Sequence, residues 1–427
     1  MKIVLIGAGS RSFGFGQIRD LMVASELAEM NVTLSLVDTD SSALKLMARV
    51  AARLKEQTGS GIEIEATTDR RKALPGADYV ITVVSIRRWE LWEQEFRIST
   101  AYGFNQALGE NGGPAALFHT MRSLELIIPI CSDIEELCPD AWLFNFTNPE
   151  ARVLSAILNH TNVKAAGFCH GVFTALEYIE KYTGKTRDEL DVHSAGINHF
   201  YAILKATNRA TGEDLLPLLL EKAIADEHAP PLFRKFAEIM DVFTFPSEDH
   251  IGEYLAFGTS YIGTRWHFGI EHQRITRESE PIDRWLEDIA ESGKISDDHL
   301  APSGELTVPI IADMMFDRKN FRPAVNVLNT GGHISNLPVS AAIEIPAIVD
   351  KDGLHPVDVG ALPEGFASYV RAQLTITETA VEAWRLKSRK LLLRALLLDP
   401  VVTNVEAAEK MLDELLELQL DFLPDFT

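Results

Sequence analysis

KIVLIGAGS, residues 2–10, is an apolar strand that runs directly into a Gly-x-Gly turn. A bound pyrophosphate needs this arrangement, because glycines remove the Cβ atoms from the close approach and the helix that follows offers free N–H groups. The match to the usual fingerprint is imperfect, since Ser12 takes the place of the third glycine. We predict that Gly7, Gly9 and Ser10 bind a dinucleotide.

Asp38 follows the second predicted strand and is the candidate acid for the ribose hydroxyls. It lies 31 residues after Gly7, which is farther than the usual interval. A carboxylate at this place favours NAD over NADP, because it repels a 2′-phosphate. Asp38 could equally cap the helix that is expected to begin at Asp40 or Ser41, and the two roles are compatible.

Short apolar runs alternate with amphipathic stretches over residues 1–195. The alternation predicts strands at residues 3–6, 33–37, 79–84, 142–146 and 163–167, and helices at residues 17–28, 41–56, 115–137 and 150–159. Such a pattern indicates an α/β fold with a doubly wound, Rossmann-type parallel sheet covered on both faces. Ligands bind beyond the carboxyl ends of these strands, so Ser85, after the third, and Asn145, at the end of the fourth, are predicted to contact the cofactor.

From about residue 196 the pattern changes to longer helices mixed with short strands. We predict a dinucleotide-binding domain over residues 1–195 and an α+β domain over residues 196–427 that carries substrate, metal and subunit contacts. In the second part the periodicity predicts helices at 215–223 and 231–239, a long helical segment at 368–418, strands around 325–338 and 342–348, and a surface connection at 350–364.

Composition limits the classes of partner. The chain has 427 residues and a formal net charge of −22, which would repel nucleic acid and anionic lipid surfaces. No apolar run is long enough to span a membrane, and the residues before Gly7 are typical of a strand and not of a signal peptide. The cysteines are few and indicate reduced thiols, with burial expected for the first two: Cys131, Cys138 and Cys169. We therefore expect a cytoplasmic protein with a small-molecule substrate.

Cys169 lies in the run GFCHG (167–171), and His199 ends the run GINH (196–199). Each follows a predicted strand beside glycine, and a thiolate with an imidazole suits a borderline divalent metal. Two ligands are fewer than a typical zinc site has, but open positions would let substrate hydroxyls reach a Lewis acid. Taken singly, the cysteine is more often a buried apolar side chain and the histidine a hydrogen-bonded core residue.

Several further motifs in the same order make the chain recognisable. They are IGAGS (6–10), GENGG (109–113), NFTNP (145–149), FCHG (168–171), GINH (196–199), HIGEY (250–254) and VNVLNTGGHISNLP (325–338). The chain resembles glycoside hydrolase family 4 over essentially its whole length. The resemblance implies a Rossmann domain joined to an α+β domain, as in the lactate and malate dehydrogenase superfamily. It also implies dependence on NAD and a divalent metal, commonly Mn²⁺, and suggests a homodimer or homotetramer.

The family mechanism differs from the usual pair of carboxylates. NAD takes a hydride from C3 of the sugar, the C2 proton is removed, the C1 group is eliminated, water adds and the hydride returns. The resemblance assigns the metal to Cys169 and His199, the base to Tyr254, with Tyr261 as a rival, and the proton donor to His170.

Other residues are implied to contact the substrate or to orient the base. Asn148 is the candidate for a sugar hydroxyl, and Glu110 and Asn111 are expected to line the same cleft. Asp249 and His250 are candidates to orient the base or the ligand, although loop polar residues also serve as turn formers.

The residues after the cysteine point to the sugar. Cys169-His170-Gly171 resembles the uronic-acid branch, whereas other residues after Cys-His are found in α-galactosidases and α-glucosidases. A C6 carboxylate requires a cation, for which the candidates are Arg88 and His119, with Arg87 and Arg122 as alternatives. We therefore predict an α-galacturonidase or α-glucuronidase. The alternatives are an α-galactosidase or α-glucosidase of the same family, a metal-independent NAD-dependent 2-hydroxyacid dehydrogenase, and a non-catalytic NAD-binding sensor.

Overall fold

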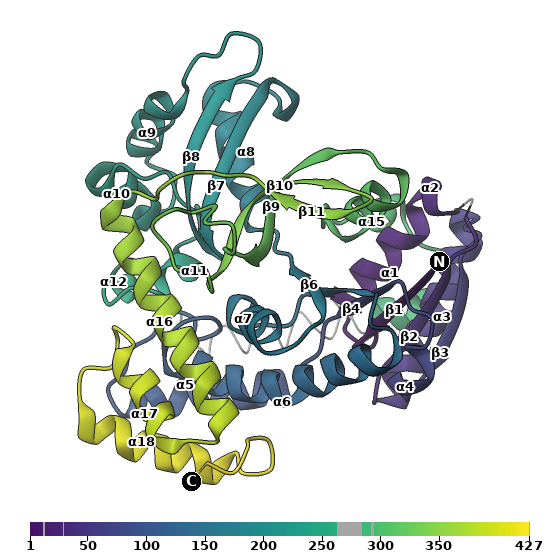
Figure 1. Cartoon of the computed structure of the whole chain (residues 1–427), viewed down its shortest axis with the longest axis horizontal. Coiled ribbons are helices and arrows are strands. Elements are labelled where there is room, and N and C mark those ends of the chain that lie inside the picture. Colours follow the sequence, from purple (N-terminus) through teal and green to yellow (C-terminus); the bar gives the residue numbers. More distant parts are fainter. Residues whose placement is uncertain (12, 29, 263–283, 292–293, 427) are drawn as a thin grey trace.

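The computed structural model describes the whole chain except residues 12, 29, 263–283, 292–293 and 427, so Ser12 lies outside the described residues. Its strands form one mixed sheet of 11 strands in the order β3-β2-β1-β4-β5-β6-β9-β10-β7-β8, with β11 paired to β10. Figure 1 shows the N-terminal strands at one end of the molecule and the C-terminal helices at the other.

The first six strands confirm the predicted doubly wound sheet. They pair in parallel in the order 3-2-1-4-5-6, the order typical of dinucleotide-binding folds. Along β1, Ile3 and Leu5 enter one buried cluster while Val4 and Ile6 enter another, so both faces of the sheet are covered. The strands are β1 (Lys2–Ile6), β2 (Thr33–Val37), β3 (Glu63–Thr67), β4 (Tyr79–Thr82), β5 (Trp142–Asn145) and β6 (Lys164–Gly167).

Helices connect these strands and cover the sheet. Asp40 caps α3, because its carboxylate accepts hydrogen bonds from the backbone N–H groups of Ser42 and Ala43, and the left-handed Gly59 ends the helix. The long helix α6 runs beneath the sheet and reaches the C-terminal helices (Figure 1). The helices are α1 (Phe13–Val23), α2 (Ser25–Ala28), α3 (Ser41–Thr58), α4 (Arg70–Ala73), α5 (Arg88–Ala101), α6 (Gly113–Leu137), α7 (Glu150–His160) and α8 (Gly171–Thr183).

Beyond β6 the sheet continues with antiparallel strands. Gly167 of β6 pairs with Asn326 of β9, and β10, β7 and β8 follow. The boundary predicted between residues 195 and 196 falls inside β7, so one sheet is shared by both parts of the chain, and the division into two domains stays a prediction. The added strands are β7 (Leu190–Ile197), β8 (Phe200–Asn208), β9 (Asn320–Leu328), β10 (Ala342–Asp350) and β11 (Gly353–Pro356).

The expected helical segment at 368–418 is three helices. Left-handed Lys387 ends α16, and the side chains of Ser388 and Asn404 cap α17 and α18. The surface connection expected at 350–364 contains β11. No helix of the described residues combines the length and apolar character needed to cross a membrane. The remaining helices are η1 (Arg187–Glu189), α9 (Leu216–Ala225), α10 (Pro231–Met240), α11 (Glu248–Gly252), α12 (Gly258–Ile262), α14 (Asp297–Leu300), α15 (Thr307–Phe316), α16 (Glu364–Leu386), α17 (Arg389–Leu398) and α18 (Val405–Leu418).

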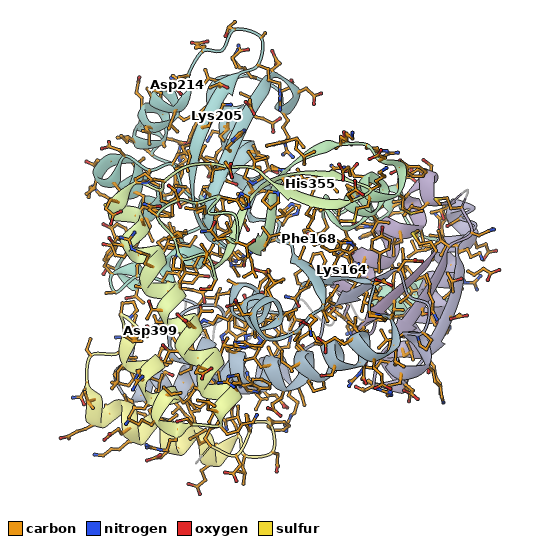
Figure 2. The ribbon with its side chains drawn as sticks, viewed as in Figure 1. Lys164, Phe168, Lys205, Asp214, His355 and Asp399 are labelled. Carbon is orange, nitrogen blue, oxygen red and sulfur yellow. The ribbon has the colours of Figure 1, made fainter. Side chains whose placement is uncertain are left out.

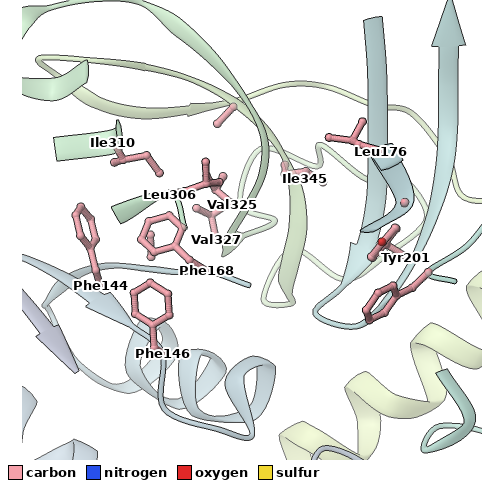
Figure 3. Close-up of a cluster of buried hydrophobic side chains, with 14 of the residues drawn as sticks. Phe144, Phe146, Phe168, Leu176, Tyr201, Leu306, Ile310, Val325, Val327 and Ile345 are labelled. Atoms are coloured by element: carbon pink, nitrogen blue, oxygen red, sulfur yellow. The ribbon is translucent and has the colours of Figure 1, made fainter. Parts of the chain in front are cut away.

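Aromatic packing holds the end of β6 in place. The Phe168 ring meets Phe144 edge to face at a centroid distance of 5.1 Å and lies 5.8 Å from Phe146. Figure 3 shows these rings together near Val325 and Val327 of β9. Phe168 lies near the middle of the molecule (Figure 2), so its neighbour Cys169 leaves the sheet where the parallel and antiparallel strands meet.

Candidate active site

A cavity of about 360 Å³ opens at the carboxyl ends of β1, β2 and β4. Gly7, Gly9, Ser10, Asp38 and Ser85, the residues predicted to contact the cofactor, line it. A Cβ atom on Gly7, whose φ is +91°, would lie 2.5 Å from the Val83 carbonyl oxygen, and one on Gly9 would lie 2.7 Å from Asp38 Oδ2. Glycine is therefore required for the backbone to lie this close to its neighbours at both positions.

The Asp38 carboxylate lies at the end of β2 and shapes this cavity. Its Oδ2 accepts a hydrogen bond from Gly9 N at 2.8 Å, and its Oδ1 accepts one from Asp40 N at 2.9 Å. The capping role considered for Asp38 belongs to Asp40, since that side chain accepts hydrogen bonds from the first N–H groups of α3. Asp38 is thus left facing the cavity.

Asn145, predicted to contact the cofactor, is fully buried and is not among the described residues that line this cavity. Its side-chain oxygen Oδ1 accepts hydrogen bonds from Thr82 Oγ1 and Thr147 N, and its side-chain nitrogen Nδ2 donates one to the Thr147 carbonyl oxygen. These bonds tie β5 to β4 and shape the loop that carries Asn148. Asn145 therefore supports the loop that carries Asn148 without itself lining the cavity.

A second cavity, of about 260 Å³, is lined by several of the other motif residues. Asn148, Glu110, Arg88, Cys169, His170 and His199 all line it. A small cavity of about 50 Å³ joins the two, because it shares Ser10 and Ser85 with the first, and Arg88 and Asn148 with the second. His119 also lines this junction. Stretches that lie far apart in the sequence are thereby brought around one continuous space.

Cys169 and His199 meet inside the second cavity. Cys169 follows Phe168 just beyond the end of β6, and His199, with a φ of +66°, lies in the turn between β7 and β8. Cys169 Sγ and His199 Nε2 are 3.0 Å apart, while Asn111 Nδ2 lies 3.4 Å from the other ring nitrogen, Nδ1. Burial raises the pKa of the Cys169 thiol, and burial followed by repulsion from His250 lowers the pKa of His199.

This pair could hold a metal with two protein ligands. Its sulfur and nitrogen lie side by side in the second cavity, and Asn111 holds the ring from its far side, as outer partners of metal-binding histidines commonly do. Within the described part of the chain, no third His, Cys, Asp or Glu completes a group able to hold a metal ion. Open coordination positions would therefore remain for other ligands.

His170 stands at the entrance to the second cavity as the residue before α8. Its side chain is 47% exposed, and its Nδ1 lies 3.7 Å from Glu305 Oε1. Burial, with the charge of Asp20 adding to it, raises the pKa of Glu305 to about 7. The predicted proton donor thus has a mostly buried carboxyl group beside it.

Tyr254 is buried and is not among the described residues that line either large cavity. Its hydroxyl donates to the carbonyl oxygen of Asn198, at a distance of 3.2 Å, and Asn198 does line the second cavity. Burial raises the pKa of Tyr254, Glu253 adds to the effect, and Arg152 opposes it. Tyr261, the rival, is half-buried on α12 and is likewise absent from the described cavity walls.

The structure places only some of the residues assigned to the substrate together. Asn148 donates to Glu110 Oε1 at 3.1 Å, and Arg88 pairs with the same carboxylate, so these three form one cavity wall. Asn111 instead lies behind His199. His119 Nδ1 lies 3.3 Å from Glu110 O, and burial, followed by repulsion from Arg122 and Arg88, lowers its pKa.

Two of the four proposed cations do not reach the cavities. Arg122 is buried in an ion pair with Glu95, and exposed Arg87 pairs with Glu90. Arg88 lines both the second cavity and the junction, and its Nε has no hydrogen-bond partner among the described residues.

His250 and Asp249, the candidates for orienting the base or the ligand, form a pair at the cavity wall. His250 Nδ1 lies 2.9 Å from Asp249 Oδ1, and the His250 ring meets the His199 ring at a centroid distance of 4.3 Å. Burial would lower the pKa of His250, but the hydrogen bond and charge of Asp249 raise it. Because His250 lines the cavity, the pair is placed to orient a bound ligand.

The structure adds two carboxyl groups that sequence analysis missed. Glu150 lines the second cavity, and neither of its buried oxygens has a partner among the described residues; burial followed by the charge of Glu344 raises its pKa. Glu150 directly follows the motif at 145–149, so its place in that motif was the available signal. Glu305 lies in a segment without any motif, and its approach to His170 required the fold.

Comparison with known proteins explains this arrangement. A model of the family 4 glycosyl hydrolases matches residues 2–185, and a model of the family's C-terminal domain matches residues 194–402. The chain belongs to glycosyl hydrolase family 4. This membership confirms the resemblance seen in the sequence and makes the chain a glycoside hydrolase.

Relatives in family 4 differ in their named substrates. An α-glucosidase from Erwinia rhapontici is 30% identical, with 99% of this chain and 98% of the relative covered. An α-galactosidase from Rhizobium meliloti is also 30% identical (100% and 89% covered), and an α-galacturonidase from Lachnoclostridium phytofermentans is 25% identical (99% and 97% covered).

Solved structures confirm the fold class. A 6-phospho-α-glucosidase from gut microorganisms, in complex with NAD and Mn²⁺, aligns with a TM-score of 0.84 at 18% identity, covering 100% of this chain and 99% of that one. A malate dehydrogenase from Plasmodium falciparum aligns with a TM-score of 0.52 at 14% identity, covering 92% and 99%.

Proposed function

We propose that this family 4 enzyme hydrolyses α-glycosides of uronic acids, α-galacturonides or α-glucuronides, with the help of NAD and a divalent metal such as Mn²⁺. The approach of Cys169 Sγ to His199 Nε2, at 3.0 Å beside the junction of two cavities, is the observation that carries the proposal. When bound, NAD would take a hydride from C3 of the sugar and return it, and the metal would polarise the oxygens at C2 and C3.

The residues present fit both groups. Gly7, Gly9 and Ser10 leave room for a pyrophosphate at the start of α1, and the Asp38 carboxylate is placed for ribose hydroxyls. Cys169 and His199 offer one soft and one borderline donor, a set suited to a first-row divalent ion. Support for the two cofactors also comes from the solved relative that contains NAD and Mn²⁺.

The proton transfers are assigned to His170 and Tyr254. His170, which lines the second cavity and is 47% exposed, would protonate the departing oxygen. Tyr254 would take the C2 proton. To do so, its hydroxyl would break its hydrogen bond to the Asn198 carbonyl oxygen. The positive charge of Arg152 favours the phenolate form of Tyr254.

Sugar binding is assigned to the wall formed by Asn148, Glu110 and Arg88. The Asn148 amide and the Glu110 carboxylate offer a donor and an acceptor for ring hydroxyls. The free Nε of Arg88 and the adjoining His119 are assigned to the C6 carboxylate. Gly171 leaves space beside Cys169 on the opposite side.

A second candidate substrate is a neutral α-glucoside or α-galactoside. The two relatives at 30% identity are named for these activities. In addition, Glu110, Glu150 and Glu305 all face the cavity and, where ionised, would oppose a further carboxylate. Cytoplasmic location and a homodimer or homotetramer stay predictions.

A panel of 4-nitrophenyl α-glycosides decides between these substrates. We expect the purified enzyme, with NAD, Mn²⁺ and a reducing agent, to cleave the galacturonide or the glucuronide, and to lose activity when any additive is omitted. Efficient cleavage of the galactoside or glucoside together with none of the uronides would show that the uronide assignment is wrong.

Two neighbouring arginines supply a matched control for the panel. Arg88→Met removes a charge-assisted hydrogen bond to the uronide, worth about 1.5–3 kcal/mol or roughly 10- to 150-fold in kcat/KM. Arg87→Met removes the same charge from an exposed side chain outside the cavities and should change little. Two results would show that Arg88 does not recognise the C6 group. One is an equal loss of kcat/KM in both variants; the other is an equal loss for Arg88→Met on uronides and on neutral glycosides.

A further inference from the structure

The segment that precedes α15 carries a carboxyl group to the proton donor assigned above. Glu305 lines the same cavity as His170, and its side chain is 14% exposed where that of His170 is 47% exposed. Glu305 Oε1 lies 3.7 Å from His170 Nδ1. The two residues come from distant parts of the chain, so their approach is a product of the tertiary fold.

Hydrogen bonds to the N-terminal helix hold this segment in position. On α1, the helix that begins after the glycine turn, the Asp20 carboxylate accepts hydrogen bonds from Ser303 N, at 2.9 Å, and from Ser303 Oγ. Ser303 Oγ in turn accepts from Glu305 N at 3.1 Å. Buried Asp20 thereby fixes the backbone that carries Glu305.

The same segment also limits the His170 ring. A Cβ atom on Gly304 would lie 3.1 Å from His170 Cε1, so the backbone of the segment lies directly against the imidazole. Phe173 lies on another side of the ring, at a centroid distance of 5.2 Å. The ring is therefore confined although nearly half of its surface is open to the cavity entrance.

We propose that Glu305 is a positioning residue, which accepts the Nδ1–H of His170 and so leaves Nε2 as the nitrogen that exchanges protons with the substrate. This inference rests on the proposed function. A carboxylate beside one ring nitrogen selects the tautomer in the manner of the acid in a Ser-His-Asp triad. Catalytic hydrogen bonds that are long without ligand commonly shorten in the complex, which suits the 3.7 Å separation.

In this proton transfer, each bond that breaks is matched by one that forms. As the bond between C1 and the glycosidic oxygen breaks, its electron pair stays on that oxygen, and the proton on Nε2 moves to it. Neutral His170, with Nδ1–H facing Glu305, is left behind. When water adds at C1, the water proton returns to Nε2 and the hydroxyl oxygen becomes the new C1 substituent.

The ring tautomer gives a test that needs neither substrate nor cofactor. In ¹⁵N-histidine-labelled full-length enzyme, with His170 assigned by the His170→Asn variant, we expect the neutral ring to carry its proton on Nδ1. Glu305→Ala should shift it toward the Nε2–H form, Glu305→Gln should preserve Nδ1–H, and Glu177→Gln, an exposed change on α8, should have no effect. An unchanged tautomer in Glu305→Ala would overturn the proposal, whatever the enzyme cleaves.

Kinetics then measure the consequence in the holoenzyme. With NAD and Mn²⁺ present, Glu305→Ala should lower kcat about 10- to 100-fold on alkyl glycosides, whose leaving groups need a proton, with little change on a dinitrophenyl glycoside or in KM. Glu305→Gln should recover part of the loss, and His170→Ala/Glu305→Ala should be no slower than His170→Ala. An equal loss of kcat on both leaving groups, or additive losses in the double variant, would show that Glu305 is merely structural. If the wild-type enzyme cleaved no glycoside, that result would instead count against the proposed function.

Discussion

Cys169→Ser should lower kcat/KM about a hundred- to a thousandfold, which is the scale of losing one preorganised electrostatic partner of a transition state. A serine hydroxyl stays protonated near neutral pH and binds a divalent ion poorly, whereas a metal deprotonates a thiol. The Gly171 N–H that now donates to Sγ at 3.4 Å can donate to a serine oxygen, so the fold should survive. Activity with added Mn²⁺ and metal content per chain are the two measurements.

Another cysteine supplies the control for this variant. Cys138 is buried in the apolar cluster behind the sheet, so Cys138→Ala removes a thiol without touching the site and should keep metal content and turnover. Thermal unfolding should confirm that both variants are folded. Full activity and unchanged metal content in Cys169→Ser would contradict the metal site.

Gly9→Ala should weaken NAD binding about 10- to 150-fold, the equivalent of roughly 1.4–3 kcal/mol of overpacking. The added Cβ would lie 2.7 Å from Asp38 Oδ2 and 2.8 Å from Ala43 Cβ, so Asp38 or α3 must move. Either shift disturbs the hydrogen bond from Gly9 N to Asp38 and the floor of the cavity. Calorimetric titration with NAD measures the change directly.

Gly16→Ala is the matched substitution. Gly16 lies on α1, the same helix that follows the turn, and a Cβ there meets nothing within 4 Å. Alanine favours a helix over glycine, so this variant should bind NAD normally and be slightly more stable. If Gly9→Ala bound NAD as tightly as Gly16→Ala, the turn would not be the pyrophosphate site.

Sequence periodicity predicted the buried strands well because their apolar runs are short and continuous. β1, β2 and β5 are predicted within one residue at each end. The missed strand β3 has the opposite character: it lies at the sheet edge, and none of its residues is fully buried, so its polar sequence EIEAT carries little signal. The C-terminal helices were merged because only backbone turns and caps separate their apolar patterns.

The glycine-flanked motifs led to residues that line the two cavities, since turn chemistry at the ends of strands is local. The motifs could not distinguish residues that face the cavity from those behind it. Asn145, Asn111 and Tyr254 belong to the same motifs, yet they are not among the described cavity-lining residues, and their side chains instead bond to residues that are: Thr147, His199 and Asn198. Glu305 is the reverse case, because it lies in no motif and its segment is held near His170 by the long-range hydrogen bond between Asp20 and Ser303.

Incorporation of deuterium at C2 of the released sugar tests the central claim most directly. Removal of the C2 proton by a residue open to exchange, followed by elimination and addition of solvent water, must place solvent hydrogen at C2. In D₂O, NMR of the product should show deuterium at C2 at every turnover, and activity should require both NAD and the metal. Rapid hydrolysis with only ¹H at C2 would contradict elimination and point to direct displacement at C1.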